Sequence, residues 1–175
     1  MMANGYVLSP KSKSYHALDS FVYEYINCGG TKDNLKIEIN YMLRCHVLPV
    51  ARREVRLPWN EEKLTVFSVA PLEIFASKTV ALLTRTAPRY LYDMHNMVKF
   101  GLFDESEEAM LRKCVVFYSA IGSAQPPEKF ALDNIGNVSF RQIKRDLNSV
   151  LRKGERFDLE FVQKEVKDYL TSVLV

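Results

Sequence analysis

The spacing of apolar residues in this 175-residue chain changes once, near residue 70. Before that point, apolar and polar residues alternate in short segments, as expected of strands that bury one face. After it, apolar residues recur every three or four positions, which is the period of amphipathic helices. The chain therefore predicts an α+β fold in which a small antiparallel sheet precedes a C-terminal helical bundle. We expect residues 1–70 to form the β-rich part and residues 71–175 a helical domain packed on it, together one compact unit.

The sheet is predicted mainly from two alternating segments, residues 17–26 and 35–43. They flank a stretch rich in asparagine, glycine and aspartate, so they most simply form an antiparallel hairpin. Shorter extended segments follow at residues 54–57 and 64–69, on either side of a predicted turn at residues 58–63.

Prolines, a glycine and a capping sequence mark the predicted helix ends. Pro71 and Pro88 suit the first turn of a helix, where a missing amide costs little. Gly101 is suited to end the second helix. Asp104, with Glu107 three residues later, resembles the capping box of a third helix. The other predicted helices span about residues 71–86, 88–100, 139–152 and 158–174.

Composition limits the class of protein. No apolar run approaches the ~18 residues of a membrane-spanning helix. The N-terminus has neither the basic start nor the apolar stretch of a signal peptide, so we expect a cytoplasmic protein without membrane contact. Cys28, Cys45 and Cys114 are odd in number and widely spaced, which predicts reduced thiols and no zinc site.

The net charge of +3 is too small to indicate nucleic-acid binding by itself. Basic residues nevertheless gather in two stretches of the sequence. Each stretch is either a solvated surface or part of an RNA-binding surface. The first consists of Arg44, His46, Arg52, Arg53 and Arg56, and the second of Arg141, Lys144, Arg145, Arg152 and Lys153.

Charged residues also interrupt the two apolar helices that follow residue 70. Lys78 and Arg85 are seven residues apart, about two helical turns, so both project from one side of the first helix. Arg89 and Asp93 are four residues apart on the second helix. Three cations and a carboxylate arranged in this way look like a site for a phosphorylated ligand.

Each of these residues also has a purely structural interpretation. The stem of Lys78 can lie against the core while its ammonium group reaches water. Arg85 and Arg89 can complement helix ends, and Arg89 can pair with Asp93 for a few tenths of a kcal/mol. Only the combination of residues favours ligand binding.

Glu38 is the one carboxylate in the otherwise apolar second strand, on the face opposite Leu35, Ile37 and Ile39. A buried carboxylate is costly unless it is paired or bound to a metal. Glu38 therefore either has a functional role or is satisfied by Lys36 or a neighbouring strand.

Taken together, these positions resemble the AbiEii/AbiGii toxin family of nucleotidyltransferases. Lys78, Arg85, Arg89 and Asp93 fall at the family's spacing on two helices, and the strand that carries Glu38 precedes them. The resemblance covers most of the chain from about residue 14 and extends to the closing helices.

The resemblance implies a polymerase-beta-like core that binds a nucleoside triphosphate with magnesium and positions it for attack by a hydroxyl, such as that of an RNA acceptor. Such chemistry depends on positioning and charge neutralisation. Glu38 would help to hold magnesium or accept the hydroxyl proton, and Lys78 would touch the triphosphate. Arg85 and Arg89 would add phosphate contacts, while Asp93 would orient a basic partner or contact the nucleotide. The family also implies a role in toxin–antitoxin or phage-defence systems, with an antitoxin as partner.

Two features depart from the family pattern. Tyr90 stands where the family usually has an aspartate after the arginine. The chain also has no Asp-x-Asp, the pair that supplies most of the metal ligation, and we interpret Gly29-Gly30-Thr31 as a hairpin turn. We therefore expect an N-terminally truncated family member that binds magnesium weakly and has little or no activity alone.

An alternative of a different class is a non-catalytic interaction module. If strands of the family core are missing, a sheet edge is left exposed, and unpaired edge strands recruit other strands. Such a chain would form a homodimer or bind a partner through that edge.

Overall fold

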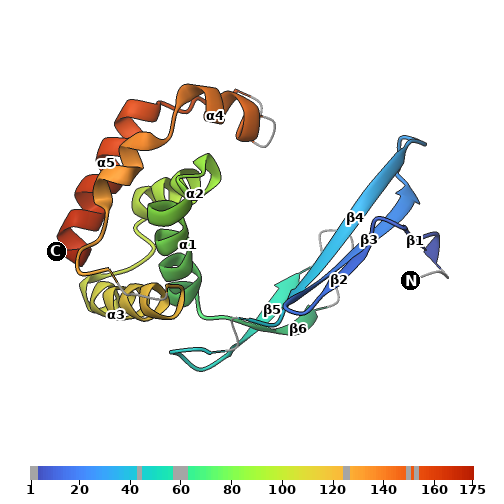
Figure 1. Ribbon diagram of the computed structural model, residues 1–175, viewed down its shortest axis with the longest axis horizontal. Coiled ribbons are helices and arrows are strands. Elements are labelled where there is room, and N and C mark those ends of the chain that lie inside the picture. Colours follow the sequence, from blue (N-terminus) through green and yellow to red (C-terminus); the bar gives the residue numbers. More distant parts are fainter. Residues whose placement is uncertain (1–3, 43–44, 57–62, 124–126, 149–150, 152–153) are drawn as a thin grey trace. The chain divides into compact units, whose positions relative to one another are not determined.

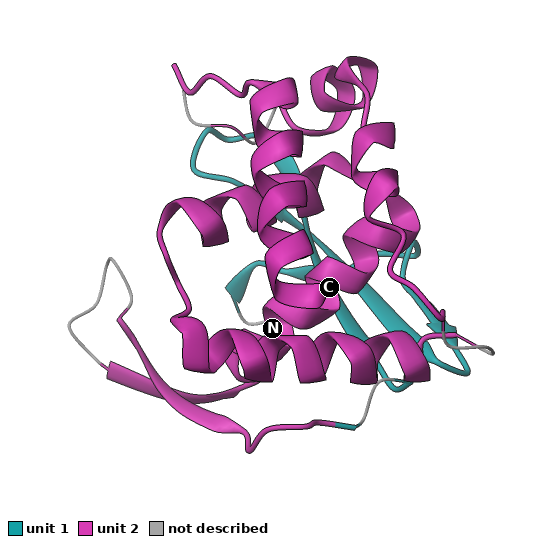
Figure 2. Ribbon diagram, turned by 90° about the vertical axis from the view of Figure 1, so that its left-hand side faces the viewer, with its two compact units in different colours: residues 1–45 teal, residues 46–175 magenta. Residues whose placement is uncertain are grey.

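The computed structural model describes residues 4–42, 45–56, 63–123, 127–148, 151 and 154–175. Its contacts divide the chain into two compact units, residues 1–45 (unit 1) and residues 46–175 (unit 2), which are coloured separately in Figure 2. Small antiparallel sheets precede the helices, which confirms the predicted α+β class. The predicted domain boundary after residue 70 stays a prediction.

Unit 1 is an antiparallel sheet built around strand β3 (Leu18–Ile26). Strand β4 (Lys32–Asn40) pairs with one side of β3, and the short strands β1 (Val7–Leu8) and β2 (Lys13–Tyr15) pair with the other. The predicted hairpin is confirmed, although β4 begins at Lys32 and not at residue 35. Strands β1 and β2 were not predicted.

The hairpin turn explains the earlier start of β4. The side-chain oxygen of Asn27 accepts hydrogen bonds from the backbone N–H groups of Gly29 and Thr31. Gly30 has a φ of +74°, which glycine adopts without strain. The turn therefore closes within residues 27–31, and pairing resumes with Ile26 opposite Lys32.

Strand register brings apolar side chains of β3 and β4 to a common face, with Phe21 opposite Ile37 and Tyr23 opposite Leu35. In the described part of unit 1, however, the only buried side chains are those of Ser9 and Ser20. The apolar core of the protein lies among the helices of unit 2.

Unit 2 begins with a two-stranded antiparallel ribbon of β5 (Ala51–Arg56) and β6 (Lys63–Ser68). These strands confirm the two extended segments predicted from the sequence, with β5 starting three residues earlier and β6 shifted by one residue. The turn predicted at residues 58–63 lies outside the described residues except for Lys63.

Helices α1 (Pro71–Arg85) and α2 (Pro88–Lys99) both begin with proline, as predicted. Only Thr86 and Ala87 join them, and Thr86 takes the left-handed conformation with a φ of 49°. Gly101, with a φ of +54°, follows the end of α2, where this conformation favours glycine. The two-residue connection between α1 and α2 keeps these two helices adjacent in the fold.

Helix α3 (Glu105–Ile121) has the predicted capping box. The Asp104 carboxylate accepts hydrogen bonds from the backbone of Ser106 and Glu107, and the Glu107 side chain accepts one from the backbone of Asp104. Of the predicted apolar stripe, Leu111, Cys114, Val115 and Tyr118 are buried, and Met110 is half-buried.

The C-terminal part holds a short 3₁₀ helix η2 (Leu132–Asn137), helix α4 (Phe140–Asp146) and helix α5 (Leu159–Leu174). Ser139 and Asp158 cap α4 and α5. The helix predicted over residues 139–152 was too long, because α4 ends at Asp146. Asp146 and the nearby Asn148 both have low helix propensity, which favours an end at this point. Residues 149–150 and 152–153, including the predicted core residue Val150, lie outside the described part.

The helices of unit 2 enclose the core. Helix α3 packs against α1, and α5 packs against α2 (Figure 1). Fully buried leucines, methionines and valines from all four helices form one cluster, as the helical periodicity predicted. In the described part of the chain, no helix has the length and apolar character needed to cross a membrane.

Candidate functional site

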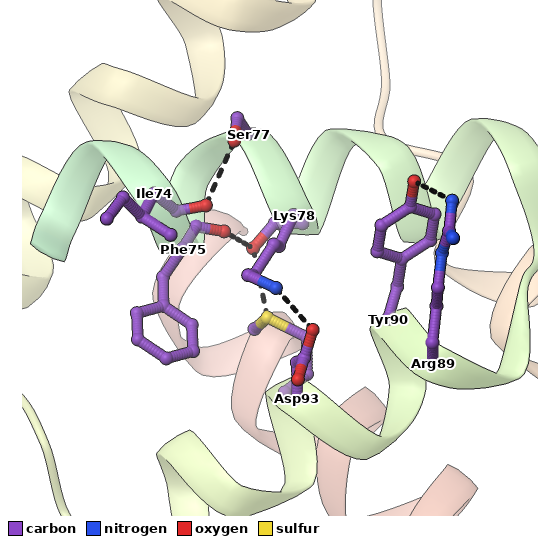
Figure 3. Close-up of polar contacts among 9 residues, drawn as sticks. Ile74, Phe75, Ser77, Lys78, Arg89, Tyr90 and Asp93 are labelled. Atoms are coloured by element: carbon purple, nitrogen blue, oxygen red, sulfur yellow. Dashed lines mark hydrogen bonds and ion pairs between the residues drawn. The ribbon is translucent and has the colours of Figure 1, made fainter. Parts of the chain in front are cut away.

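The helix pair α1–α2 brings two of the predicted site residues into direct contact. The Lys78 ammonium on α1 donates a hydrogen bond to the Asp93 carboxylate on α2, forming an ion pair between the helices (Figure 3). The two side chains are 31% and 34% exposed, so the pair lies at the surface end of the helix contact. Asp93 therefore pairs with Lys78 on the other helix, and the structural interpretation of an Arg89–Asp93 pair is not what the structure shows.

The position of Lys78 follows from the buried side of α1. Its neighbour Thr79 is fully buried and donates a hydrogen bond to the backbone oxygen of Phe75 and a weak one to the sulfur of Met94 on α2. Because one residue along a helix turns the side chain by about 100°, Lys78 stands at the border of the buried face. Its ammonium group reaches both Asp93 and solvent.

Arg85 and Arg89 meet at Tyr90, the residue that departs from the family pattern. The Arg89 guanidinium lies over the Tyr90 ring, 4.9 Å from its centroid, and donates a hydrogen bond of 3.1 Å to its hydroxyl (Figure 3). Burial alone would raise the pKa of Tyr90, but the hydrogen bonds and charges of Arg89 and Arg85 outweigh it and lower the pKa. Tyr90 is thus in direct contact with Arg89, and Arg85 also contributes to the lowered pKa of its hydroxyl.

This arrangement predicts an unusual titration. The difference in phenolate absorbance between the wild type and Tyr90→Phe is expected to have its midpoint below the ordinary tyrosine value of 10.0, because the two guanidinium groups stabilise the phenolate. Arg89→Gln is expected to raise that midpoint, whereas Lys99→Gln, at the other end of α2, should leave it unchanged. A midpoint at the ordinary value that no arginine substitution moves would contradict the contact.

Glu38, the fifth predicted site residue, lies on β4 in unit 1. Its carboxylate pairs with the Lys36 ammonium at 2.7 Å, and its side chain is 46% exposed. The sequence suggested that Glu38 could be a buried carboxylate in need of a partner, but its side chain is exposed. Of the two interpretations, the structure shows the pair with Lys36. Any role in metal binding or proton transfer stays a prediction.

The described residues offer little to a resident magnesium ion. They contain no cluster of three or more His, Cys, Asp or Glu side chains arranged to hold a metal. Glu38 and Asp93 each already pair with a lysine. Magnesium usually takes one or two carboxylates plus substrate phosphates, so the described side chains do not fit a metal held by the protein alone.

Glu73 is a buried carboxylate whose role the sequence did not reveal. It is 1% exposed in the first turn of α1, where its oxygens accept hydrogen bonds from the backbone N–H groups of Val47 and Leu48 at 2.7 and 3.3 Å. The Tyr118 hydroxyl donates a third bond of 2.8 Å from α3. The partners lie 25 or more residues away in sequence, so no local pattern could indicate them. Glu73 joins three segments of unit 2 through these hydrogen bonds.

Two further polar contacts join α2 to the C-terminal part. His95 pairs through Nδ1 with Glu165 on α5, and its ring meets the edges or faces of Phe157 and Phe161 at near-right angles. The Tyr92 hydroxyl donates a hydrogen bond of 2.9 Å to Glu155. These contacts hold the Tyr92 and His95 side of α2 against the C-terminal part of unit 2.

The family model of the nucleotidyl transferase AbiEii toxin, from type IV toxin–antitoxin systems, matches residues 9–171. The chain belongs to the AbiEii family. No curated protein and no solved structure shows a significant match. The matched range includes all five predicted site residues, and it places this AbiEii chain among nucleotidyltransferase-type toxins.

For this AbiEii chain, the structure brings together four of the five predicted residues on one helix pair. Lys78 and Asp93 form one contact, and Arg85 and Arg89 converge on Tyr90. Seven helical positions separate Lys78 from Arg85, roughly 10 Å along the axis of α1. The three cations therefore cover an extended face, which suits a ligand with several phosphate groups better than a single ion.

Proposed function

We propose that this AbiEii chain binds a nucleoside triphosphate on the face where α1 and α2 present Lys78, Arg85 and Arg89, and uses it in nucleotidyl transfer. The observation that carries the proposal is the Lys78–Asp93 pair between the two helices. Arg85 and Arg89 extend the same face, and both lower the pKa of Tyr90. In a family of nucleotidyltransferase-type toxins, such a face accounts for recognition of the phosphates.

Each residue has a specific role in this proposal. Lys78 contacts the triphosphate, while Asp93 orients the lysine and limits its motion before the nucleotide arrives. Arg85 and Arg89 add bidentate hydrogen bonds to phosphate oxygens, which the planar guanidinium group suits. For Glu38 we retain the proposed role of metal ligand or proton acceptor. Its observed pair with Lys36 does not add support for that role.

Magnesium enters as part of the substrate. Because the described side chains do not form a metal cluster, we propose that the triphosphate oxygens supply most of the ligands and the protein few or none. We therefore expect weak or absent nucleotidyl transfer by the chain alone. The acceptor is proposed to be an RNA hydroxyl, and the expected biological partner is a cognate antitoxin in the cytoplasm, within a toxin–antitoxin or phage-defence system.

Calorimetric titration with nucleoside triphosphates tests the proposal. In the presence of magnesium, the wild type is expected to give saturable binding, and nucleoside monophosphates are expected to bind more weakly because they make fewer phosphate contacts. Absence of binding at millimolar triphosphate would refute a nucleotide site on this chain.

A second candidate function is assembly through a sheet edge. Strand β4 is nine residues long, pairs only with β3 among the described strands, and exposes Leu35 and Ile39. A long edge with apolar side chains is a template for pairing with another strand, so a homodimer or a complex with a protein partner is the expected result. Sedimentation that shows only monomer throughout the micromolar range, and no change on Ile39→Lys substitution, would count against this candidate.

A further inference from the structure

The β5–β6 ribbon carries an exposed face that the proposed nucleotide site does not use. Register places Arg52 opposite Phe67, Glu54 opposite Thr65 and Arg56 opposite Lys63, so these six side chains share one face of the ribbon. Five residues of each strand are exposed. The remaining face holds Arg53 among smaller apolar residues.

Charge is concentrated on this ribbon. Its two strands contain four cations, namely Arg52, Arg53, Arg56 and Lys63, and one carboxylate, Glu54, which Lys63 contacts at 2.9 Å. The two strands thus have a net charge of +3, while the sequence that joins them adds Glu61 and Glu62. Each strand has six residues and is about 20 Å long. Three of the four cations, Arg52, Arg56 and Lys63, share one face of the ribbon with Glu54, which gives that face a net charge of +2.

An aromatic ring stands on the same face as the two outer arginines. Phe67 is 71% exposed, the highest exposure of any described aromatic side chain outside the chain ends. The guanidinium carbon of Arg52 lies 5.3 Å from the centroid of its ring. Exposure of a phenylalanine on a solvated ribbon is unfavourable by itself, so the ring has surface available for a further stacking partner.

We propose that the basic face of the β5–β6 ribbon, formed by Arg52, Arg56, Lys63 and Phe67, binds single-stranded nucleic acid. The cations contact backbone phosphates, and Phe67 with the Arg52 plane stacks on an unpaired base. Positively charged grooves with stacking aromatics are the usual means of binding single strands without reading their sequence.

Single-stranded nucleic acid fits this face better than its competitors. A two-stranded ribbon can also enter the major groove of a duplex, but duplex bases are already stacked and would leave Phe67 without a partner. An acidic protein would satisfy the cations and would likewise not require the ring. The exposed ring beside the arginines therefore favours an unpaired base.

Fluorescence anisotropy with a labelled 12-nucleotide oligouridine, measured without nucleotide or magnesium, tests the proposal. Arg52→Gln/Arg56→Gln is expected to lower affinity at least about tenfold and to reduce the slope of log K against log salt by about 1.4, since each phosphate contact on a single strand contributes roughly 0.7. Phe67→Leu is expected to lower affinity about tenfold with little change in slope, because stacking is lost and charge is kept.

A matched control removes the same charge from the other basic stretch. Arg141→Gln/Lys144→Gln changes two exposed residues of α4 and is expected to leave affinity nearly unchanged. Equal losses in the two double variants would show general attraction to charge and overturn the proposal. So would equal affinity for a duplex of the same length, or binding that does not depend on Phe67. Thermal unfolding of each variant shows whether its fold is kept.

The binding claim is independent of the proposed nucleotide site. Loss of oligonucleotide binding in ribbon variants with unchanged triphosphate binding would separate the two surfaces, and failure of either experiment leaves the other interpretable.

Discussion

Glu73→Leu is expected to lower the free energy of unfolding by about 2–3 kcal/mol, because it removes the carboxylate that accepts three hydrogen bonds and bonds to a charged acceptor contribute roughly 1.5–3 kcal/mol. The carboxylate is the acceptor for two backbone N–H groups and for the Tyr118 hydroxyl. Leucine has a similar volume but no acceptor, so the hydrogen bonds from the two backbone N–H groups and from the Tyr118 hydroxyl to residue 73 would be lost. Chemical denaturation gives the free energy directly.

Glu105→Leu supplies the matched control for this prediction. Glu73 and Glu105 both stand in the first turn of a helix, so both complement the helix dipole. Glu105 is exposed, and its replacement is expected to change stability little. Tyr118→Phe, which removes one of the three donors, should cost about 1 kcal/mol. Similar small effects for Glu73→Leu and Glu105→Leu would contradict the structural role of Glu73.

The surroundings of Glu73 supply a second readout. Burial, and after it the negative charge of Glu73, raises the pKa of the Cys114 thiol. Glu73→Gln is therefore expected to lower the pKa of Cys114 partway toward its ordinary value. Thiol reactivity measured against pH reports this shift even if the substitution leaves overall stability less affected than expected.

Lys78→Met is expected to weaken binding of a nucleoside triphosphate by at least about tenfold, since a hydrogen bond to a charged group is worth roughly 1.5–3 kcal/mol. Methionine preserves the length and the apolar stem of the side chain while removing its charge. Stability should change by no more than about 1 kcal/mol, because the pair with Asp93 is about one-third exposed. Calorimetry and denaturation measure the two effects separately.

Lys99→Met is the control for charge. Lys99 stands in the last turn of α2 and is exposed, so the same charge is removed from the same helix pair at a distance from Lys78. Its affinity for triphosphate is expected to stay close to that of the wild type. Equal losses in the two variants would mean that the nucleotide responds only to overall charge.

Much of the fold was predictable because local signals agreed with tertiary packing. The prolines that begin α1 and α2 and the capping box of α3 fixed three helix starts. The end of α4 at Asp146 was not predictable, because the apolar period of the sequence continues to Leu151. Strands β1 and β2 contain two and three residues, too few for any periodicity.

The sequence allowed us to predict which residues belong to the candidate site, but not which residues contact one another there. Helical spacing placed Lys78 and Arg85 on one side of α1, but the pairing of Lys78 with Asp93 depends on how α2 lies against α1. Tyr90 stood where the family usually has an aspartate, and the structure shows it under the guanidinium group of Arg89. Partners separated by many residues, such as those of Glu73, leave no pattern in a single sequence.

The most direct test of the central claim is an NMR titration of the isotopically labelled chain with a nucleoside triphosphate and magnesium. The proposed site predicts saturable shifts of the Arg85 and Arg89 side-chain N–H resonances and of the Lys78 side chain, with the Arg52 resonance of the β5–β6 ribbon nearly unchanged. If the triphosphate saturates the protein while the resonances of Lys78, Arg85 and Arg89 stay in place, the α1–α2 face is not its binding site.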